Sequence, residues 1–369
     1  MAFFEKIDTS KFFVRNQYYI CNIEFAILWN NRRRCEFLFG SREGISMKQP
    51  VLDVLSYEDM DKIHAATLQV LSEVGIAINH AEARALYKAA GCDVNDQTKV
   101  VKIPPELVNE CIKKSPDHFT LYSRDGKHDV KMVSDGSVTN YTTFGIGVKC
   151  THYLGPGKYE MRKSTLEDIG NIAKVFDACE NVDEICQPVT ALDYATADCS
   201  RTIREVDAVM SNTSKPFWQD TESDCLDIYA DYETAVYGGD EEEARKKPFL
   251  MPCGCPSSPL QLDHAACEIY SKSQAYGMPV MILSMAMGAA SSPIFLGGTL
   301  VTHNAEVLAG IVLAQIANPG CSVVYGSSTT SFDFFCDTAP VGSPELGLIS
   351  AGVAQLAKYY KIPSTVAGI

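Results

Sequence analysis

The spacing of apolar positions divides the chain into two differently patterned regions after Met47. In the first region, apolar residues recur at helical spacing behind Ser56 and stop at Gly75, a glycine that suits a helix end. The same criteria place helices at 56–75, roughly 81–90 and 104–114, and a hairpin with an Asp-Gly turn at 119–133. We therefore expect residues 47–134 to form a helical N-terminal segment with a small hairpin.

From residue 135 onward, short β-rich runs alternate with longer helical patterns, and a seventh run begins near Ser364. The first six runs are Val138–Phe144, Ile185–Thr190, Pro216–Gln219, Phe249–Cys253, Val280–Ser284 and Ser322–Tyr325. Strict alternation of strand and helix predicts a parallel sheet, which is either doubly wound or closed into a (β/α)8 barrel.

Serine-led sequences predict where four of the helices begin. Ser164-Thr165-Leu166-Glu167 and Ser258-Pro259-Leu260-Gln261 have the spacing of capping boxes. Ser292-Pro293 and Ser343-Pro344-Glu345 place proline at the first helical position, where its missing N–H costs nothing.

Two observations favour the barrel over the doubly wound sheet. The sequence contains neither a G-x-G-x-x-G after the first strand nor a G-x-x-x-x-G-K-[ST] motif, so the nucleotide-binding signatures of open sheets are missing. The spacing of the runs is roughly 38 residues per unit, and eight such units would take roughly 300 residues, within the range of TIM barrels. The fold class predicted for 135–369 is therefore α/β, an incomplete TIM barrel of about six and a half units.

Composition narrows the class of protein. With 46% hydrophobic residues, a chain of 369 residues can bury a large core. The net charge of −14 argues against a nucleic-acid partner, which would require clustered Lys and Arg. Fourteen cysteines without a secretion signal predict a reducing, cytoplasmic location. Cys253 and Cys255 form an isolated C-x-C, so we expect no structural metal site.

The first 46 residues differ from the rest of the chain. They are rich in aromatic residues and contain Arg32-Arg33-Arg34, and their apolar stretch from Tyr18 to Trp29 is too short to span a bilayer. They could be a membrane-surface arm, but we favour an atypical extension at 1–46 ahead of a natural start at Met47. No membrane association is therefore predicted.

In a barrel, loops at the carboxyl ends of the strands converge on the active site. The candidate substrate-binding residues at these ends are Tyr141, Phe144, Gln187, Gln219, Asp220, Cys253, Tyr325, Gly326 and Asp333. This aromatic, amide-rich and mildly acidic set suits a small cation. Packing roles remain open for the aromatic residues and for Cys253, and the two glutamines could instead satisfy loop backbone groups.

Three long blocks resemble the trimethylamine methyltransferase family of corrinoid-dependent methyltransferases. They are "LSEVGIAINHAEARALYKAAGCDV", "GGTLVTHNAEVLAGIVLAQIANPGCSVVYGSS" and "VGSPELGLISAGVAQLAKYYKIP", and the resemblance extends from Met47 to the end of the chain. It implies a TIM barrel that moves a methyl group from trimethylamine to the cobalt of a corrinoid, carried by a cognate corrinoid protein. It also implies a homo-oligomer with no tightly bound cofactor of its own.

The resemblance further implies that the catalytic residue follows directly after "YYKIPSTVAGI", Tyr359–Ile369. Family members that use trimethylamine carry pyrrolysine at that place, encoded by an amber codon, so we expect an in-frame amber codon after Ile369. A glycine betaine or other quaternary-amine enzyme would have an ordinary residue there. An inactive truncated fragment or a scaffold that binds the corrinoid protein is the remaining alternative.

Overall fold

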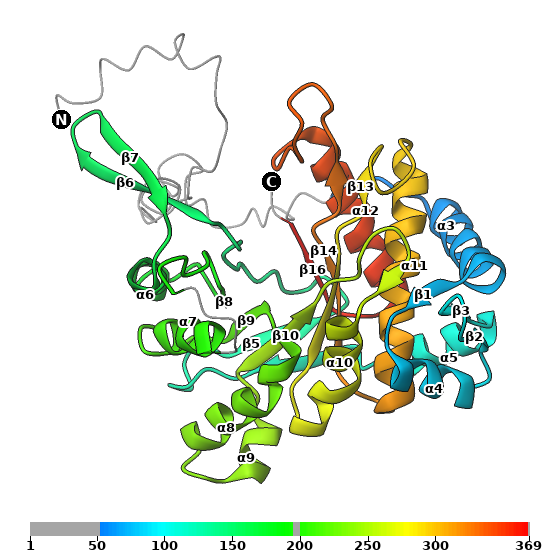
Figure 1. Ribbon diagram of the computed structural model, residues 1–369, viewed down its shortest axis with the longest axis horizontal. Coiled ribbons are helices and arrows are strands. Elements are labelled where there is room, and N and C mark those ends of the chain that lie inside the picture. Colours follow the sequence, from blue (N-terminus) through cyan, green and yellow to red (C-terminus); the bar gives the residue numbers. More distant parts are fainter. Residues whose placement is uncertain (1–51, 195–199, 368–369) are drawn as a thin grey trace, which may run out of the picture.

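The computed structural model describes residues 52–194 and 200–367, so the expected extension at 1–46 lies outside the described residues (Figure 1). The N-terminal segment contains the three expected helices, and Ser56 and Asp59 form the predicted capping box. Its elements are α3 (Tyr57–Gln69), the short π-helical η2 (Val70–Val74), β1 (Ile76–Ile78), α4 (Ala81–Ala89), β2 (Asp93–Asn95), β3 (Val100–Lys102) and α5 (Pro105–Lys114).

The expected hairpin is also present, as β4 (His118–Leu121) paired antiparallel with β5 (Val130–Val133). Its apolar residues Leu121, Val130 and Met132 pack into the same cluster as the inward-facing residues of the main sheet. Tyr122 N donates to Pro248 O, just before a sheet strand begins. The hairpin therefore covers the amino-terminal end of the sheet.

Six parallel strands form the main sheet, and they neighbour one another in chain order. They are β8 (Ile185–Cys186), β9 (Phe217–Asp220), β10 (Leu250–Gly254), β12 (Val280–Ser284), β14 (Val323–Ser327) and β16 (Ser364–Val366). A doubly wound sheet reverses its strand order at a switch point. The sequential order and the curl of the sheet in Figure 1 therefore confirm the part-barrel prediction.

The first predicted strand, Val138–Phe144, is not a continuous strand. Its residues meet the sheet through an isolated parallel bridge, Thr142 with Glu184, and a second bridge joins Gly147 to Val189. A Cβ on Gly145 would lie 1.9 Å from Gln187 O, so this stretch crosses the neighbouring backbone too closely for a regular ladder.

Helices cover the outer face of the sheet (Figure 1). They are α6 (Leu166–Asp177), α7 (Ser200–Met210), α8 (Leu226–Val236) with the 3₁₀ turn η3 (Ser223–Cys225), α9 (Glu241–Lys246), α10 (His264–Lys272) with η4 (Ser273–Tyr276), α11 (Leu296–Ala317) and α12 (Pro344–Tyr360). Short strands in the loops are β11 (Gln261–Leu262), β13 (Met287–Gly288) and β15 (Thr330–Ser331).

Of the four predicted helix starts, only Ser343 caps its helix as expected. The α6 cap is Thr165, one residue later than predicted, with Asp168 completing the box. The prediction at Ser258 was wrong, because Gln261 and Leu262 pair with β1 of the N-terminal segment and α10 begins only at His264. Ser292-Pro293 likewise precedes α11, which begins at Leu296 without a side-chain cap. At Ser258, strand pairing with a distant segment therefore prevents the helix that the local capping sequence predicts.

Helix α11 is long and apolar enough to cross a membrane, yet it lies in the core. About 78% of its apolar window is buried within the protein. Tyr87 of α4 donates to Ala309 O at 2.7 Å, and Gln315 donates to Ser115 Oγ after α5 at 3.1 Å. These bonds attach the N-terminal segment to the barrel through α11.

A second hairpin, β6 (Lys149–Gly155) and β7 (Lys158–Lys163), was not predicted. It follows the bridged stretch near Thr142 and stands apart from the body of the protein in Figure 1. Its antiparallel register pairs Tyr153 with Tyr159 and Thr151 with Met161.

Gly277, which ends η4, offers a test of close packing. Its φ is +84°, and a Cβ there would lie 2.6 Å from both Cα and O of Arg245. We expect Gly277→Ala to lower the free energy of unfolding by about 2–4 kcal/mol, measured by chemical denaturation, because it adds a clash to left-handed strain. Gly238→Ala is the control, since Gly238 has a φ of +68° and nothing within 4 Å. Equal losses in the two variants would contradict the role of the contact.

Glu233 of α8 provides a pH test of a buried carboxyl. It is 1% exposed, and its Oε1 accepts hydrogen bonds from the N–H groups of Phe249 and Leu250, both at 2.9 Å. Burial raises its pKa to about 8, so the folded state holds a proton that the unfolded chain releases at lower pH. Stability from this group is therefore complete at low pH and declines as the pH rises toward 8.

Glu233→Gln keeps the acceptor oxygen and removes this decline. The difference in unfolding free energy between the variant and the parent should shift in favour of the variant by on the order of 3 kcal/mol as the pH rises from 5 to 8. Exposed Glu167 supplies the control variant, Glu167→Gln. A difference between Glu233→Gln and the parent that does not change with pH would show that Glu233 is ionised in the folded protein.

Candidate active site at the carboxyl ends of the strands

Alternation along the strands separates the side chains that face into the barrel from those that face the helices. Inward-facing residues of five strands form one cluster with the β4–β5 hairpin: Cys186, Trp218, Met251, Cys253, Met281 and Val324. Strand register places Asp220 and Met281 on either side of Cys253. This layer is the floor of a candidate site whose walls are the next residues toward the carboxyl ends.

Asp220 is the acidic group of this layer. It ends β9 two residues after the inward-facing Trp218, and its side chain remains open to solvent. The surrounding atoms of the barrel mouth nevertheless desolvate it, and this raises its pKa, with further increases from the charges of Glu222 and Asp263. A carboxylate in these surroundings is stabilised by a cationic guest.

Thiols and apolar groups surround Asp220. Cys255 Sγ lies 3.9 Å from Asp220 Oδ1, and the hydrogen bond that the neutral Cys253 thiol donates to Cys255, together with burial, raises the pKa of Cys253 well above its usual value. Cys253 is therefore a neutral part of the floor of the site and not a thiolate nucleophile. Leu283, Gly326 and Thr365 lie side by side one layer further out, by the register of β12, β14 and β16.

Asp220, Cys253 and Gly326 are thus the sequence-predicted residues that the structure brings together on the inner face. Sequence reasoning missed Cys255 and Leu283, although both lie two residues beyond inward-facing positions and the alternation of the strands would have found them.

Tyr325 requires a correction, because its side chain faces the helices and not the barrel mouth. Its hydroxyl donates to Asn304 Oδ1 of α11 at 2.6 Å. Asn304 Nδ2 in turn donates to Thr67 Oγ1 at 2.9 Å and to the Tyr360 hydroxyl at 2.8 Å. Since neighbours in a strand point to opposite faces, Gly326 on the inner face requires Tyr325 on the outer one. Tyr325 joins the barrel to α3 and α12.

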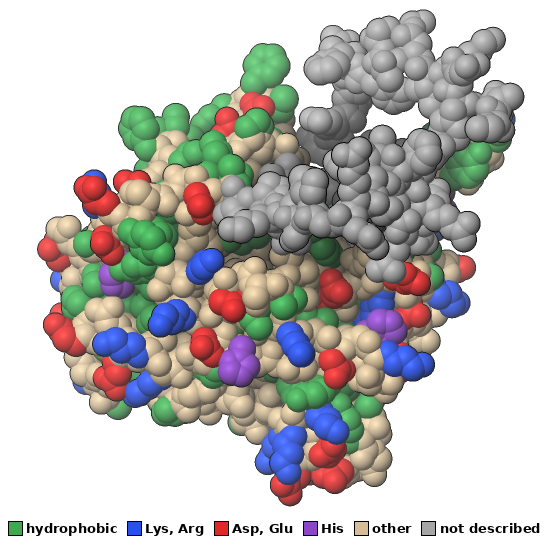
Figure 2. Space-filling model, turned by 180° about the vertical axis from the view of Figure 1, so that it is seen from behind, with side chains coloured by type: hydrophobic (Ala, Val, Ile, Leu, Met, Phe, Trp, Pro, Cys, Tyr) green, Lys and Arg blue, Asp and Glu red, His purple; other side chains and the backbone are tan. Residues whose placement is uncertain are grey.

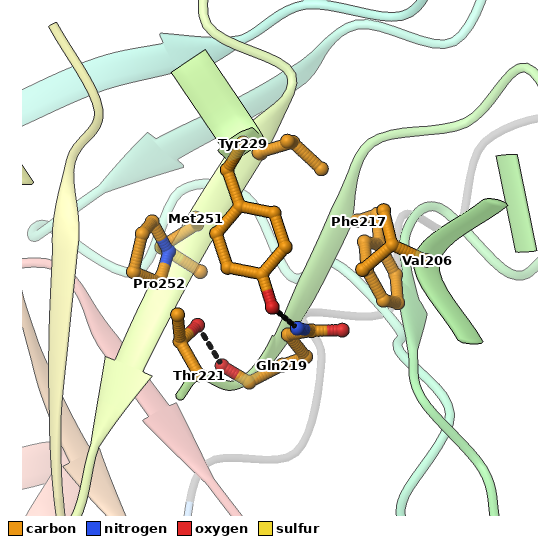
Figure 3. Close-up of a pocket in the computed structure, with 8 residues that line it drawn as sticks. Val206, Phe217, Gln219, Thr221, Tyr229, Met251 and Pro252 are labelled. Atoms are coloured by element: carbon orange, nitrogen blue, oxygen red, sulfur yellow. Dashed lines mark hydrogen bonds between the residues drawn. The ribbon is translucent and has the colours of Figure 1, made fainter. Parts of the chain in front are cut away.

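Gln219 also faces outward, beside the inward-facing Trp218 and Asp220. Figure 3 shows its amide directed at the hydroxyl of Tyr229 on α8, to which Nε2 donates a hydrogen bond. The space around it is about 10 Å³, room for no more than one water molecule. A methylated amine does not fit there, so the predicted binding role of Gln219 does not agree with its position.

The remaining predicted residues lie away from the inner layer. Gln187 is buried and donates from Nε2 to Val189 O at 3.1 Å, a local backbone bond. Tyr141 and Phe144 are 60% and 50% exposed, and Tyr141 lies at the amino-terminal end of β8, where its carbonyl accepts from Asp183 N and Glu184 N. Asp333 is exposed, and its Oδ1 accepts from the N–H groups of Phe335 and Cys336 at 2.8 and 3.2 Å, which shapes the loop after β15.

Glu306 of α11 supports the site from behind. It is fully buried. Its carboxylate accepts from Ser284 Oγ at 2.6 Å, Ser258 Oγ at 2.8 Å and Leu260 N at 2.9 Å. Ser284 ends β12, and the other two lie in the loop after β10, so Glu306 joins two loops of the barrel mouth.

One group of side chains has the spacing of a metal site but not the chemistry. His80, His264 and Glu268 bring their ligand atoms within 4.8 Å of one another. However, His80 Nδ1 accepts from Ala83 N at 3.0 Å, so its Nε2 carries the proton that it donates to Glu268 Oε1 at 2.6 Å. His80 thus has no free lone pair for a metal, and the pair instead attaches α4 to α10.

Comparison with known proteins agrees with this architecture. Solved structures of the monomethylamine methyltransferase MtmB of Methanosarcina barkeri and of a hydroxylamine MtmB complex superpose with TM-scores of 0.50 and 0.51 at 12% identity. The aligned regions cover 83% and 84% of this chain, and 60% and 63% of those chains. At this identity the likeness supports the fold alone.

Sequence relatives are much closer. Trimethylamine methyltransferase MttB1 of Methanosarcina mazei is 48% identical, MttB of Desulfitobacterium hafniense 40%, and the glycine betaine methyltransferase of D. hafniense 31%. These alignments cover 86%, 85% and 86% of this chain, but only 64%, 62% and 65% of the relatives. The chain thus spans less than two thirds of their length. Residues 31–369 match the family described as trimethylamine methyltransferase (MTTB). The chain belongs to the trimethylamine methyltransferase family.

Proposed function

We propose that this protein transfers a methyl group from trimethylamine to the cobalt of a corrinoid carried by a separate protein. The observation that carries the proposal is the 48% identity to a protein named trimethylamine methyltransferase, against 31% to one named glycine betaine methyltransferase. The mouth of the part-barrel supports it, because an acidic group there is surrounded by neutral thiols and apolar side chains.

Asp220 has a defined task in this reaction. A tertiary amine gives up a methyl group readily only when its nitrogen carries a fourth substituent, because it then leaves as a neutral molecule. Trimethylammonium meets this condition through its N–H proton. The Asp220 carboxylate accepts that N–H and keeps the proton on the substrate, while Leu283 and the thiols contact its methyl groups. Dimethylamine then leaves neutral and retains the proton.

The corrinoid would supply the nucleophile that accepts the methyl group. The described residues of the mouth fit an acceptor that approaches from outside. Met285, immediately after β12, is 42% exposed, and Gly326 leaves the inner wall of β14 without a side chain. We infer that the acceptor reaches the mouth on its carrier protein and that this chain contributes the amine-facing wall.

Glycine betaine is the weaker substrate candidate. Its carboxylate would require a cationic partner, whereas the charged residue of the described inner layer is Asp220. The catalytic residue expected after Ile369, the cytoplasmic location and the homo-oligomeric state remain predictions.

The test uses the full-length protein, its cognate corrinoid protein in the reduced state, and either trimethylamine or glycine betaine. We expect dimethylamine to form in step with methylation of the corrinoid, followed by its absorbance. A scaffold would bind the corrinoid protein without consuming amine. Turnover of glycine betaine but not trimethylamine would assign the protein to quaternary amines.

A further inference from the structure

The β6–β7 hairpin has two chemically different faces. On one face, Asp168 of α6 accepts bonds from Arg162 Nη1 and Nη2 at 2.8 and 2.9 Å and lies 3.3 Å from His152 Nε2. The same Asp168 completes the capping box of α6. The hairpin is therefore attached to the body through a fixed carboxylate and presents its other face outward.

The outward face combines aromatic, apolar and basic groups. Tyr153, Tyr159 and Met161 are 64%, 61% and 53% exposed, and the two tyrosine rings lie 5.6 Å apart. Exposed Lys149 and Lys163 pair with each other on this face, and exposed Lys158 lies at the tip of the hairpin. None of the three lysines makes an ion pair with a described residue. Exposed tyrosine and methionine are typical of protein interfaces, and a two-stranded ribbon is only marginally stable without contacts.

The positive charge of this face indicates what kind of surface it binds. Lys149 and Lys163 are the charged residues of this face and Lys158 adds a positive charge at the tip, although the whole protein has a net charge of −14. Lysines along a ribbon edge disfavour pairing with an identical ribbon, since like charges would meet. An acidic protein surface is the complementary occupant.

The position of the hairpin indicates which protein supplies this acidic surface. It follows the bridged stretch at the rim of the barrel, on the side where the strands end (Figure 1). Hydrophobic side chains also gather over the loops after β12 and β14, at the upper edge of the molecule in Figure 2. These loops expose Ile294, Phe295, Phe334, Phe335 and Val341. A protein that covers the mouth would contact both regions.

We propose that the outward face of the β6–β7 hairpin, defined by Lys149, Tyr153, Tyr159, Met161 and Lys163, binds, together with Lys158 at the tip of the hairpin, an acidic surface of the protein that carries the methyl acceptor. This inference rests on the proposed function. The aromatic pair supplies buried contact area, and the lysines accelerate encounter and set its orientation.

The test compares the full-length protein with two variants of equal charge change. One variant carries Lys149→Glu, Lys158→Glu and Lys163→Glu. The control carries Lys88→Glu, Lys113→Glu and Lys127→Glu, which are exposed in the N-terminal segment and on the β4–β5 hairpin. We expect the first variant to raise the Kd for the cognate corrinoid protein about tenfold or more and to weaken its salt dependence, whereas the control changes neither.

Three further measurements separate the outcomes. Methyl transfer from trimethylamine to free reduced corrinoid should be equal in both variants and the parent, because the hairpin lies outside the inner layer. An unchanged Kd, a loss with both acceptors, or a change of oligomeric state by light scattering would each overturn the docking proposal. Absence of turnover in the parent with either acceptor would refute the proposed function, while the Kd comparison would still decide the role of the hairpin.

Discussion

Replacing Asp220 by Asn is expected to lower kcat/KM for trimethylamine by about 10- to 100-fold, the equivalent of about 1.5–3 kcal/mol for a hydrogen bond to a charged group. Asparagine keeps the shape of the side chain but cannot hold the amine proton by charge. The loss should be largest above the pKa of Asp220, where the parent is ionised. The measurement is the initial rate of dimethylamine formation across a pH series.

Asp224→Asn is the matched control, because Asp224 is an exposed carboxyl on η3, four residues from Asp220. It removes the same charge without touching the inner face. Equal rates for Asp220→Asn and the parent would place amine binding elsewhere in the protein. A loss in the control as large as that in Asp220→Asn would show that net charge, and not position, is responsible.

Glu306→Ala is expected to lower the free energy of unfolding by about 3–5 kcal/mol, because it removes a buried acceptor and leaves its donors unpaired. These donors are Ser258 Oγ, Ser284 Oγ and Leu260 N. The loops after β10 and β12 should separate, so methyl transfer should also fall in molecules that remain folded. Chemical denaturation and the kcat of the folded fraction check the two effects.

Glu306→Gln separates the hydrogen bonds from the charge. The amide can still accept from Leu260 N, and the two serine hydroxyls can reverse their roles to accept from its NH₂ group. We expect this variant to lose much less stability than Glu306→Ala. A double-mutant cycle with Ser284→Ala would give a coupling energy near zero if the contact between Ser284 and Glu306 contributes nothing.

The architecture was largely readable from the sequence. Apolar periodicity placed α3, α4 and α5, and alternating runs placed the six strands in their observed order. Local chemistry was decisive where no distant partner competed, as at the Ser56 capping box and the Ser343 cap. Gln261 and Leu262 pair with β1 and do not form the helix predicted from Ser258. The hydrogen bonds of the strand pair stabilise this segment more than one helix cap would.

The candidate site was only partly predictable. The ends of β9, β10 and β12 could be located to within a residue, but whether a given residue faces the barrel or the helices changes with every single-residue step. Asp220 and Gln219 are adjacent in sequence, yet one lies at the mouth and the other meets Tyr229 on α8. Tyr325 and Gly326 are separated in the same way.

By itself, the sequence determined the barrel class, the order of its strands, the helical N-terminal segment and the family. These follow from periodicity and from long matching blocks, which are properties of neighbouring residues. Only the tertiary structure decided that Asp220, Cys253 and Gly326 share the inner face, that Glu306 joins two loops, and that the β6–β7 hairpin projects at the rim. Strand register and side-chain direction depend on partners far away in the chain, and no local pattern encodes those partners.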